Sequence, residues 1–240
     1  MKPIRIVKDP EIFLTLLDNE LANSVQSVLE AKSEEWAKRN PVGTVSGSSF
    51  SVCDRQAWYK YHTSDNVSTP DNFTKKLFWL GFMYERAIQD ILTKLPGKLH
   101  VNQNSFPLNM HHPEIKDITF SATTDFVKEY ADEDKTYYIP IEIKSTQLYK
   151  WKDFTYQPAH LRQLLLWIYY AKKHKLNVPY GILKYIQRSD FDTKTVVISV
   201  DTPFKKIGRV IESFEVYEPY LEKKINTMVE NITKKTLPIK

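Results

Sequence analysis

Residues 138–147 read YIPIEIKSTQ and place two charges inside a strand-like run of isoleucines. Side chains alternate between the two faces of a β-strand, so the isoleucines would point into a core while Glu142 and Lys144 share the opposite face. Charges buried on a central strand cost free energy unless they are paired or take part in chemistry. The stretch therefore predicts either a salt bridge on a solvated sheet face or a carboxylate and an ammonium group placed for chemistry. These residues alone leave both interpretations open.

The composition is that of a globular protein with one sizeable domain, or one domain with an appended helical part. The chain has 240 residues, of which 42% are hydrophobic and 26% charged, and no apolar run is long enough to span a membrane. The formal net charge of +5 gives a weak preference for a polyanionic partner. The first residues lack the apolar core of a signal peptide, and Cys53 is the single cysteine, so we expect a reducing, cytoplasmic compartment of a prokaryotic cell or a virus-infected host cell. No glycine-rich phosphate loop is present, which disfavours nucleotide-driven chemistry.

The order of predicted elements indicates a mixed α/β (α+β) fold, with a central mixed β-sheet flanked by helices. Apolar periodicity, capping residues and turn signals predict five helices and five strands. The helices are expected at 9–37, 51–62, 73–95, 158–175 and 203–235, and the strands at 99–106, 118–130, 136–144, 180–188 and 194–200. Short connections imply antiparallel pairs, whereas the helix between the third and fourth strands permits a parallel crossover. We expect one compact unit, with a helical part at 1–72, a core at 73–202 and a C-terminal helix at 203–240.

A second carboxylate is expected to lie near Glu142. The pattern of an acidic residue, any residue and a lysine occurs six times, but only Glu142 and Lys144 end an apolar strand. The preceding strand carries Asp125, and antiparallel pairing would bring it within a few ångströms of Glu142. Two carboxylates with a lysine suit Mg²⁺ or Mn²⁺, which could polarise a phosphodiester. The alternative is a purely structural cluster of the three side chains.

Two predicted helices carry further candidates for the site. Glu85 lies on the flank of its helix and could supply a third oxygen ligand, although a carboxylate at that position is more often a surface residue. His160, Gln163, Trp167 and Tyr170 share one face of the helix after the lysine strand. Gln163 could hydrogen-bond to a phosphate, and the aromatic rings could stack on bases. For Trp167 and Tyr170 we favour the alternative that they pack under a neighbouring helix.

The order of these residues resembles the PD-(D/E)xK phosphodiesterases. It is most similar to the RecB-type nucleases, including the CRISPR-associated RecB-like exonucleases and related viral and phage exonucleases. The segments that carry the resemblance are SVCDRQAWYKYH, the helix with Glu85, the Asp125 strand, Glu142-Ile143-Lys144, the Gln163 helix and YGILKYIQR. The resemblance spans residues 48–188 and implies a restriction-endonuclease-like core.

The resemblance also implies a role for each site residue. Asp125 and Glu142 would be metal ligands together with the Ile143 carbonyl, Glu85 would be the ligand from the helix, and Lys144 would be the catalytic lysine. Gln163 would match the glutamine of the QxxxY signature of the family.

The sequence departs from the family pattern at three places. Trp167 stands where the signature has tyrosine, and Ala122 replaces the glycine of the GxxD motif. Many relatives hold an iron–sulfur cluster on four cysteines, but this chain has only Cys53, so we expect no such cluster. Cys53 is then expected to be a small buried residue.

We therefore expect a Mg²⁺- or Mn²⁺-dependent deoxyribonuclease, specifically an exonuclease acting on DNA ends or single strands. Lys150 and Lys152, in the stretch YKWK, together with His160, Trp167 and Tyr170, would contact the nucleic acid. One alternative is a DNA endonuclease of the restriction or junction-resolving kind, which usually acts as a symmetric dimer. Another is a non-catalytic nucleic-acid-binding module. The sequence does not specify polarity, strand preference, RNA activity, oligomeric state or pathway.

Overall fold

The computed structural model describes residues 43–62, 72–102, 105–113, 115, 118–131, 134–147, 154–190, 192–200 and 210–238. The helix predicted at 9–37 and the lysines Lys150 and Lys152 lie outside these residues. The described helices are α3 (Gly47–Val52), α4 (Asp54–His62), α5 (Asn72–Thr93), α6 (Pro158–Lys173) and α7 (Phe214–Thr233). The strands are β1 (Thr44–Ser46), β2 (Lys98–His100), β3 (Asn109–His111), β4 (Thr119–Thr123), β5 (Phe126–Ala131), β6 (Thr136–Thr146), β7 (Tyr180–Gln187), β8 (Thr193–Ser199) and β9 (Val210–Ser213).

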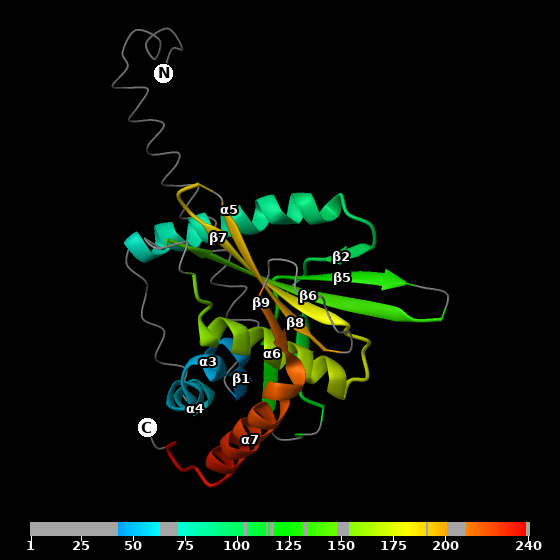
Figure 1. Ribbon diagram of the computed structural model, residues 1–240. Helices are drawn as coiled ribbons and strands as arrows, with labels where there is room; N and C mark the ends of the chain where they lie inside the picture. The colour runs from blue at the N-terminus through cyan, green and yellow to red at the C-terminus, as the bar shows by residue number, and fades with distance from the viewer. Residues whose placement is uncertain are drawn as a thin grey trace, which may run out of the picture.

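The predicted mixed sheet flanked by helices is confirmed. Within the described part of the chain, six strands form a sheet in the order β2-β5-β6-β7-β8-β9. The pairs β5–β6 and β7–β8 are antiparallel hairpins, whereas β6 and β7 are parallel and joined through α6. Figure 1 shows α5 on one side of this sheet and α6 on the other. The strand that carries YIPIEIKSTQ therefore lies centrally, between two helical layers.

The alternation of side chains along β6 gives the two faces of the sheet different environments. Ile141 and Ile143 pack with Tyr84 and Leu92 of α5 in one apolar cluster. Glu142 and Lys144 project to the opposite face, which α6 covers and where the larger core lies. The predicted separation of isoleucines from charges is confirmed.

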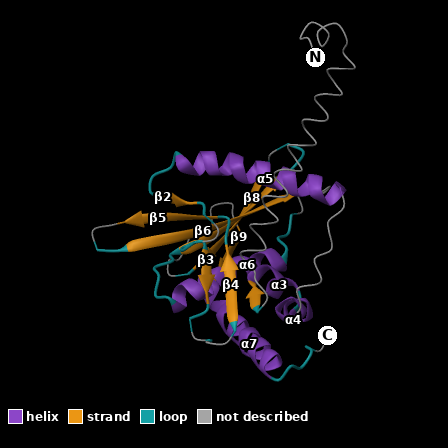
Figure 2. Cartoon of the chain, turned by 180° about the vertical axis from the view of Figure 1, so that it is seen from behind, coloured by secondary structure: helices purple, strands orange, loops and turns teal. Residues whose placement is uncertain are grey.

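The strand predicted at 118–130 is in fact two strands that belong to different sheets. β4 pairs with β1 and β3 in a three-stranded sheet, whereas β5 joins the large sheet. Figure 2 shows β3 and β4 beside α6, below the large sheet. The break falls at Thr124, whose hydroxyl donates to the Ile141 carbonyl at 2.9 Å and whose N–H donates to the Leu108 carbonyl. This break leaves Asp125 in the short connection between β4 and β5.

Further segments differ from the prediction. The strand predicted at 99–106 ends at His100 as β2, and β3 lies where no strand was predicted. The helix predicted at 51–62 is two helices, α3 and α4, separated at Cys53.

Residues 44–46, expected to be part of a loop, form β1 and pair in parallel with β4, so this part of the predicted N-terminal region is built into the core. Gly47 allows this approach, because a Cβ atom there would lie 3.2 Å from the Ala122 Cα. Residues 210–213, predicted to be helical, form β9 at the edge of the large sheet, and α7 begins at Phe214; residues 203–209 of the predicted helix lie outside the described part of the chain. None of the described helices combines the length and the apolar character needed to cross a membrane.

Lys128 of β5 caps the C-terminal end of α5 from inside the protein. This residue is only 2% exposed, and its ammonium group donates to the carbonyls of Leu92, Leu95 and Gly97 at 2.8–3.2 Å. The last carbonyls of a helix lack partners within the helix and carry partial negative charge, which explains why a buried lysine is tolerated here.

We expect the substitution Lys128→Met to lower the free energy of unfolding by about 2–3 kcal/mol, because three carbonyls, of which that of Leu92 is buried, would lose a charged donor. Urea denaturation followed by circular dichroism would measure the change. Lys94→Met is a matched control, since Lys94 lies at the same helix end but is exposed. Equal effects of the two substitutions would contradict a capping role for Lys128.

Candidate active site

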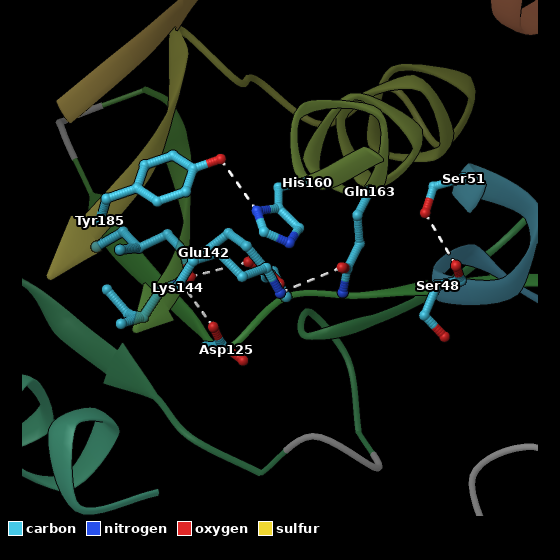
Figure 3. A network of polar contacts seen from close by, with 11 residues as sticks. Ser48, Ser51, Asp125, Glu142, Lys144, His160, Gln163 and Tyr185 are labelled. Atoms are coloured by element: carbon cyan, nitrogen blue, oxygen red, sulfur yellow. Dashed lines mark hydrogen bonds and ion pairs between the residues drawn. The ribbon is translucent and has the colours of Figure 1, made fainter. Parts of the chain in front are cut away.

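The candidate site lies where β6 ends, on the face of the sheet that α6 covers. Figure 3 shows Asp125, Glu142 and Lys144 gathered there, with Gln163 and His160 approaching from α6. Asp125 Oδ2 accepts a hydrogen bond from the Ile143 N–H at 2.7 Å, across the β5–β6 hairpin. Lys144 Nζ lies 2.5 Å from Glu142 Oε1. The predicted approach of Asp125 to the Glu142–Lys144 segment is therefore confirmed.

Gln163 holds the lysine from the side opposite the sheet. Its Oε1 accepts a hydrogen bond from Lys144 Nζ at 3.3 Å. Gln163 is on α6, which begins at Pro158 as predicted. The ammonium group is thus fixed between a carboxylate of β6 and an amide of α6, as Figure 3 shows.

The burial of the Glu142 carboxylate costs folding free energy when no ligand is bound. Its side chain is 1% exposed, and in the described structure its Oε2 is buried without a hydrogen-bond partner. Burial and the nearby charge of Asp125 raise the pKa of Glu142 to about 7, although Lys144 and, to a smaller extent, the Thr124 hydroxyl oppose the shift. A buried carboxylate oxygen with no donor is an arrangement that a ligand or an ion would complete.

Lys144 remains protonated in this environment. Burial alone would lower its pKa, but the carboxylates of Glu142 and Asp125, and to a smaller extent Glu85, raise it above the ordinary value. The side chain keeps 23% of its surface exposed, so the ammonium group is accessible from one side. These properties favour Lys144 as an electrostatic stabiliser rather than as a base.

The structure does not gather the predicted set of three acidic metal ligands. Among the described residues, no group of three or more His, Cys, Asp and Glu side chains lies close enough to hold a metal ion. Glu85, half-buried on α5, acts on Lys144 through its charge but does not join Asp125 and Glu142 in one cluster. The role of the Ile143 carbonyl stays a prediction.

The two remaining carboxylates still fit a small divalent cation. Mg²⁺ retains several waters and is commonly bound through one or two carboxylates and the substrate phosphate, so it does not require a third acidic side chain. Glu142 Oε2, which has no partner, and Asp125 on the adjacent strand end are the residues that would hold it.

Sequence reasoning missed Tyr185, which lies at the same end of the sheet. Tyr185 of β7 pairs in register with Lys144 of β6, and its hydroxyl lies 3.0 Å from His160 Nδ1. The Gln157 N–H also donates to this hydroxyl, at 3.1 Å. The sequence held a usable signal: a parallel neighbour of β6 with the same alternation places Tyr185 on the face that carries Lys144.

Two of the predicted nucleic-acid contacts are wrong. Trp167 is 0% exposed and Tyr170 is 1% exposed. The indole N–H of Trp167 donates to the carbonyls of Pro107 and Leu108, both at 3.0 Å. Neither ring has a free face on which a base could stack. The alternative that they are core residues is correct, because α6 lies between the large sheet and the layer that contains α3, β4 and α7.

Cys53 also differs from expectation. It was predicted to be a small buried residue, but it is exposed, at the short connection between α3 and α4. The backbone there is extended, which turns the side chain away from the core that α3 and α4 cover.

Comparisons with known proteins do not assign the chain to a family. No family model and no curated protein matches the sequence. Among solved structures, the crystal structure of SSO0001 is similar over 84% of this chain and 85% of that chain, with 15% sequence identity and a TM-score of 0.49. This similarity says nothing about activity, so the chemistry of the site has to be argued from the residues that the fold brings together.

Proposed function

We propose that this protein is a Mg²⁺- or Mn²⁺-dependent deoxyribonuclease that hydrolyses phosphodiester bonds, acting as an exonuclease on DNA ends or single strands. The observation that supports the proposal best is the buried Glu142 carboxylate, whose Oε2 has no partner in the described structure, beside Asp125 and the ammonium group of Lys144. This is the arrangement that the resemblance to PD-(D/E)xK nucleases implies. The net charge of +5 suits a polyanionic substrate.

Each residue has a distinct part in this chemistry. Asp125, oriented by the Ile143 N–H, and Glu142 would hold the divalent cation. Once bound, the cation would supply Lewis-acid stabilisation of the phosphate and make a water more acidic. Lys144 would offset the negative charge that develops on the phosphate oxygens, and one such electrostatic contact is commonly worth about 2.7–4 kcal/mol. Gln163 keeps the Lys144 ammonium group in place.

A purely structural cluster is the main competing interpretation. Such a cluster would stabilise the fold, but Glu142 does the reverse, because its carboxylate is buried beside a second carboxylate and its pKa is raised. Buried ionic groups of this kind are generally less stabilising than apolar residues of similar size. Their cost is better explained by binding or chemistry than by stability.

The burial of Trp167 and Tyr170 removes the support for a preference for single-stranded DNA. Base stacking on these rings was the feature of the sequence that pointed to single strands. The exonuclease assignment now rests on the resemblance alone, whereas phosphodiester hydrolysis is also supported by the geometry around Glu142.

The proposal is tested with purified protein and three DNA substrates: end-labelled linear single strands, end-labelled duplexes and a covalently closed circle. We expect linear DNA to be shortened in Mg²⁺ or Mn²⁺ but not in EDTA, with the position of the label giving the polarity. Cleavage of the circle would show an endonuclease instead. Intact DNA under every condition, together with binding that EDTA does not affect, would favour a non-catalytic module.

A further inference from the structure

A chain of three polar groups connects the start of α6 to the candidate site. It consists of the Gln157 N–H, the Tyr185 hydroxyl and the His160 imidazole. Figure 3 shows Tyr185 and His160 joined by a hydrogen bond, with His160 next to Gln163 and above Lys144. None of these three groups takes part in the reaction described above, so their arrangement requires its own explanation.

The hydrogen bonds of Tyr185 determine which nitrogen of His160 carries the proton. Its hydroxyl accepts the Gln157 N–H, and the residue is 2% exposed, so its own hydrogen needs an acceptor inside the protein. Within the described structure, the acceptor that this hydrogen meets is His160 Nδ1, at 3.0 Å. We therefore assign the acceptor role to Nδ1, because this gives the buried hydroxyl hydrogen a partner, and the hydrogen of the neutral ring is then on Nε2.

The surroundings keep the His160 ring neutral. Burial and the charge of Lys144 lower the pKa of His160 to about 4. The N-terminal end of a helix carries partial positive charge, which also disfavours a second cation and favours an anion nearby. His160 lies in the first turn of α6, two residues after Pro158. The Nε2–H is thus a fixed neutral donor beside an ammonium group, at a place that attracts negative charge.

We propose that Tyr185 acts as a positioning residue that fixes His160 with its Nε2–H directed at a substrate phosphate oxygen next to Lys144. This inference rests on the proposed phosphodiester chemistry. It makes His160 a donor to the phosphate group rather than a general contact with nucleic acid, and it gives Tyr185 a role in the same site. In Figure 3 the ring nitrogen that does not face Tyr185 points toward the side occupied by Lys144 and Gln163.

Two substitutions of His160 test the two ring nitrogens one at a time. A glutamine at this position can place an N–H near the Nε2 position but cannot reproduce the Nδ1 acceptor. An asparagine can accept from Tyr185 near the Nδ1 position but offers no donor near Nε2. We expect His160→Gln to keep cleavage within about tenfold of the wild type, whereas His160→Asn loses about 10²-fold in kcat with little change in KM. A merely structural role for His160 predicts the reverse order, and that order would overturn the proposal.

Tyr185→Phe gives a second kinetic comparison. It removes the acceptor of the Gln157 N–H and the donor to His160 Nδ1 but keeps the ring in the core. We expect a lower kcat with an unchanged KM, because the substrate still binds while the donor is no longer held in one orientation. A wild-type kcat in this variant would overturn the positioning role.

A measurement that does not depend on cleavage is the tautomer of His160 in the ¹⁵N-labelled protein. Long-range ¹H–¹⁵N spectra of the six histidines, with His160→Gln used to assign the signal, report which nitrogen is protonated. We expect protonation at Nε2 and a shift of that signal when a thymidylate hexanucleotide is added in EDTA. Protonation at Nδ1, or an Nε2 signal that the oligonucleotide leaves unchanged, would overturn the inference even in an active nuclease. An inactive protein whose Nε2 signal responds would instead refute the proposed nuclease activity and support the phosphate donor.

Discussion

Lys144→Met is expected to reduce metal-dependent DNA cleavage by at least about 10²- to 10³-fold while leaving DNA binding within a few-fold of the wild type. Methionine keeps the unbranched apolar stem of lysine and removes the charge that lies 2.5 Å from Glu142. The loss should appear in kcat, because the positive charge counts most when negative charge develops on the phosphate. Initial rates on end-labelled DNA and binding measured in EDTA would check both parts.

The structure adds a second reason for the loss. Lys144 is the group that stabilises the carboxylate form of Glu142 against burial and against Asp125. Without Lys144, Glu142 would hold its proton to higher pH and would be a weaker cation ligand at neutral pH. We therefore expect raised Mn²⁺ concentration and raised pH to recover part of the activity of the Met variant.

Lys135→Met is the matched control for this experiment. Lys135 also follows an acidic residue by two positions, and it directly precedes β6, but it is exposed at the far end of the strand from the site. We expect wild-type cleavage in this variant. Equal rates in Lys144→Met and Lys135→Met would mean that Glu142 and Lys144 are only a charge pair on the sheet.

The parts of the fold that were predictable are those with a strong local pattern. Ile139, Ile141 and Ile143 of β6 alternate with Pro140, Glu142 and Lys144, so both the strand and the assignment of its faces follow from the sequence. The start of α6 was equally clear, because a proline at the first helical position precedes a run of leucines. Asp125 was found through hairpin pairing rather than alternation, and this is why the break at Thr124 did not affect the prediction.

Two of the errors share a physical cause, which is that neighbouring parts of the chain can belong to different layers. Trp167 and Tyr170 were among the predicted nucleic-acid contacts, but a helix between two layers has two buried faces, and both side chains lie on the second, as the alternative held. Likewise, Thr119–Thr123 form β4, which pairs with β1 and β3 and not with the strands of the large sheet. No local pattern in the sequence marks the boundary between β4 and β5. Long-range pairing of this kind has no signal in the residues of one strand.

The position of Tyr185 at the candidate site does not follow from the residues around it in the sequence. Its position in YGILKYIQR fits an ordinary strand, and a tyrosine in a strand needs no special explanation. Only the parallel register with β6, which pairs Lys144 with Tyr185, shows that the hydroxyl lies at the candidate site. The role of the residue depends on geometry between two strands that are separated by a helix.

The pH dependence of stability provides a test of the site that requires no substrate. The pKa of Glu142 is raised from 4.5 to about 7 by burial and by Asp125. In the folded state the carboxyl group therefore holds its proton over a range in which the unfolded chain has released it. The stabilisation is fully present below about pH 4.5 and is lost as the pH rises through about 7, because the folded protein binds more protons than the unfolded chain in that interval.

We expect the unfolding free energy of the wild type in EDTA to fall by about 3 kcal/mol relative to Glu142→Gln between pH 4 and pH 8. At pH 4 the protonated carboxyl group and the amide are nearly isosteric and equally neutral, so the two proteins should be similarly stable. At pH 8 the glutamine variant should be the more stable, because it buries no second negative charge beside Asp125. Urea denaturation across this pH range measures the difference.

The matched control is Glu222→Gln, which removes a carboxylate whose side chain is 54% exposed, on α7 far from the site in sequence. The difference in unfolding free energy between Glu222→Gln and the wild type should change little with pH, since exposed ion pairs contribute little to stability. Addition of Mg²⁺ or Mn²⁺ at pH 8 should stabilise the wild type but not Glu142→Gln, because a ligand that binds only the folded state raises its stability. A difference between wild type and Glu142→Gln that is constant from pH 4 to pH 8 would show that Glu142 is not strained in the folded protein. If the cation stabilised both proteins equally, the metal would bind elsewhere. The pH dependence thus measures the cost of burying Glu142, and the effect of the cation tests Glu142 as a ligand.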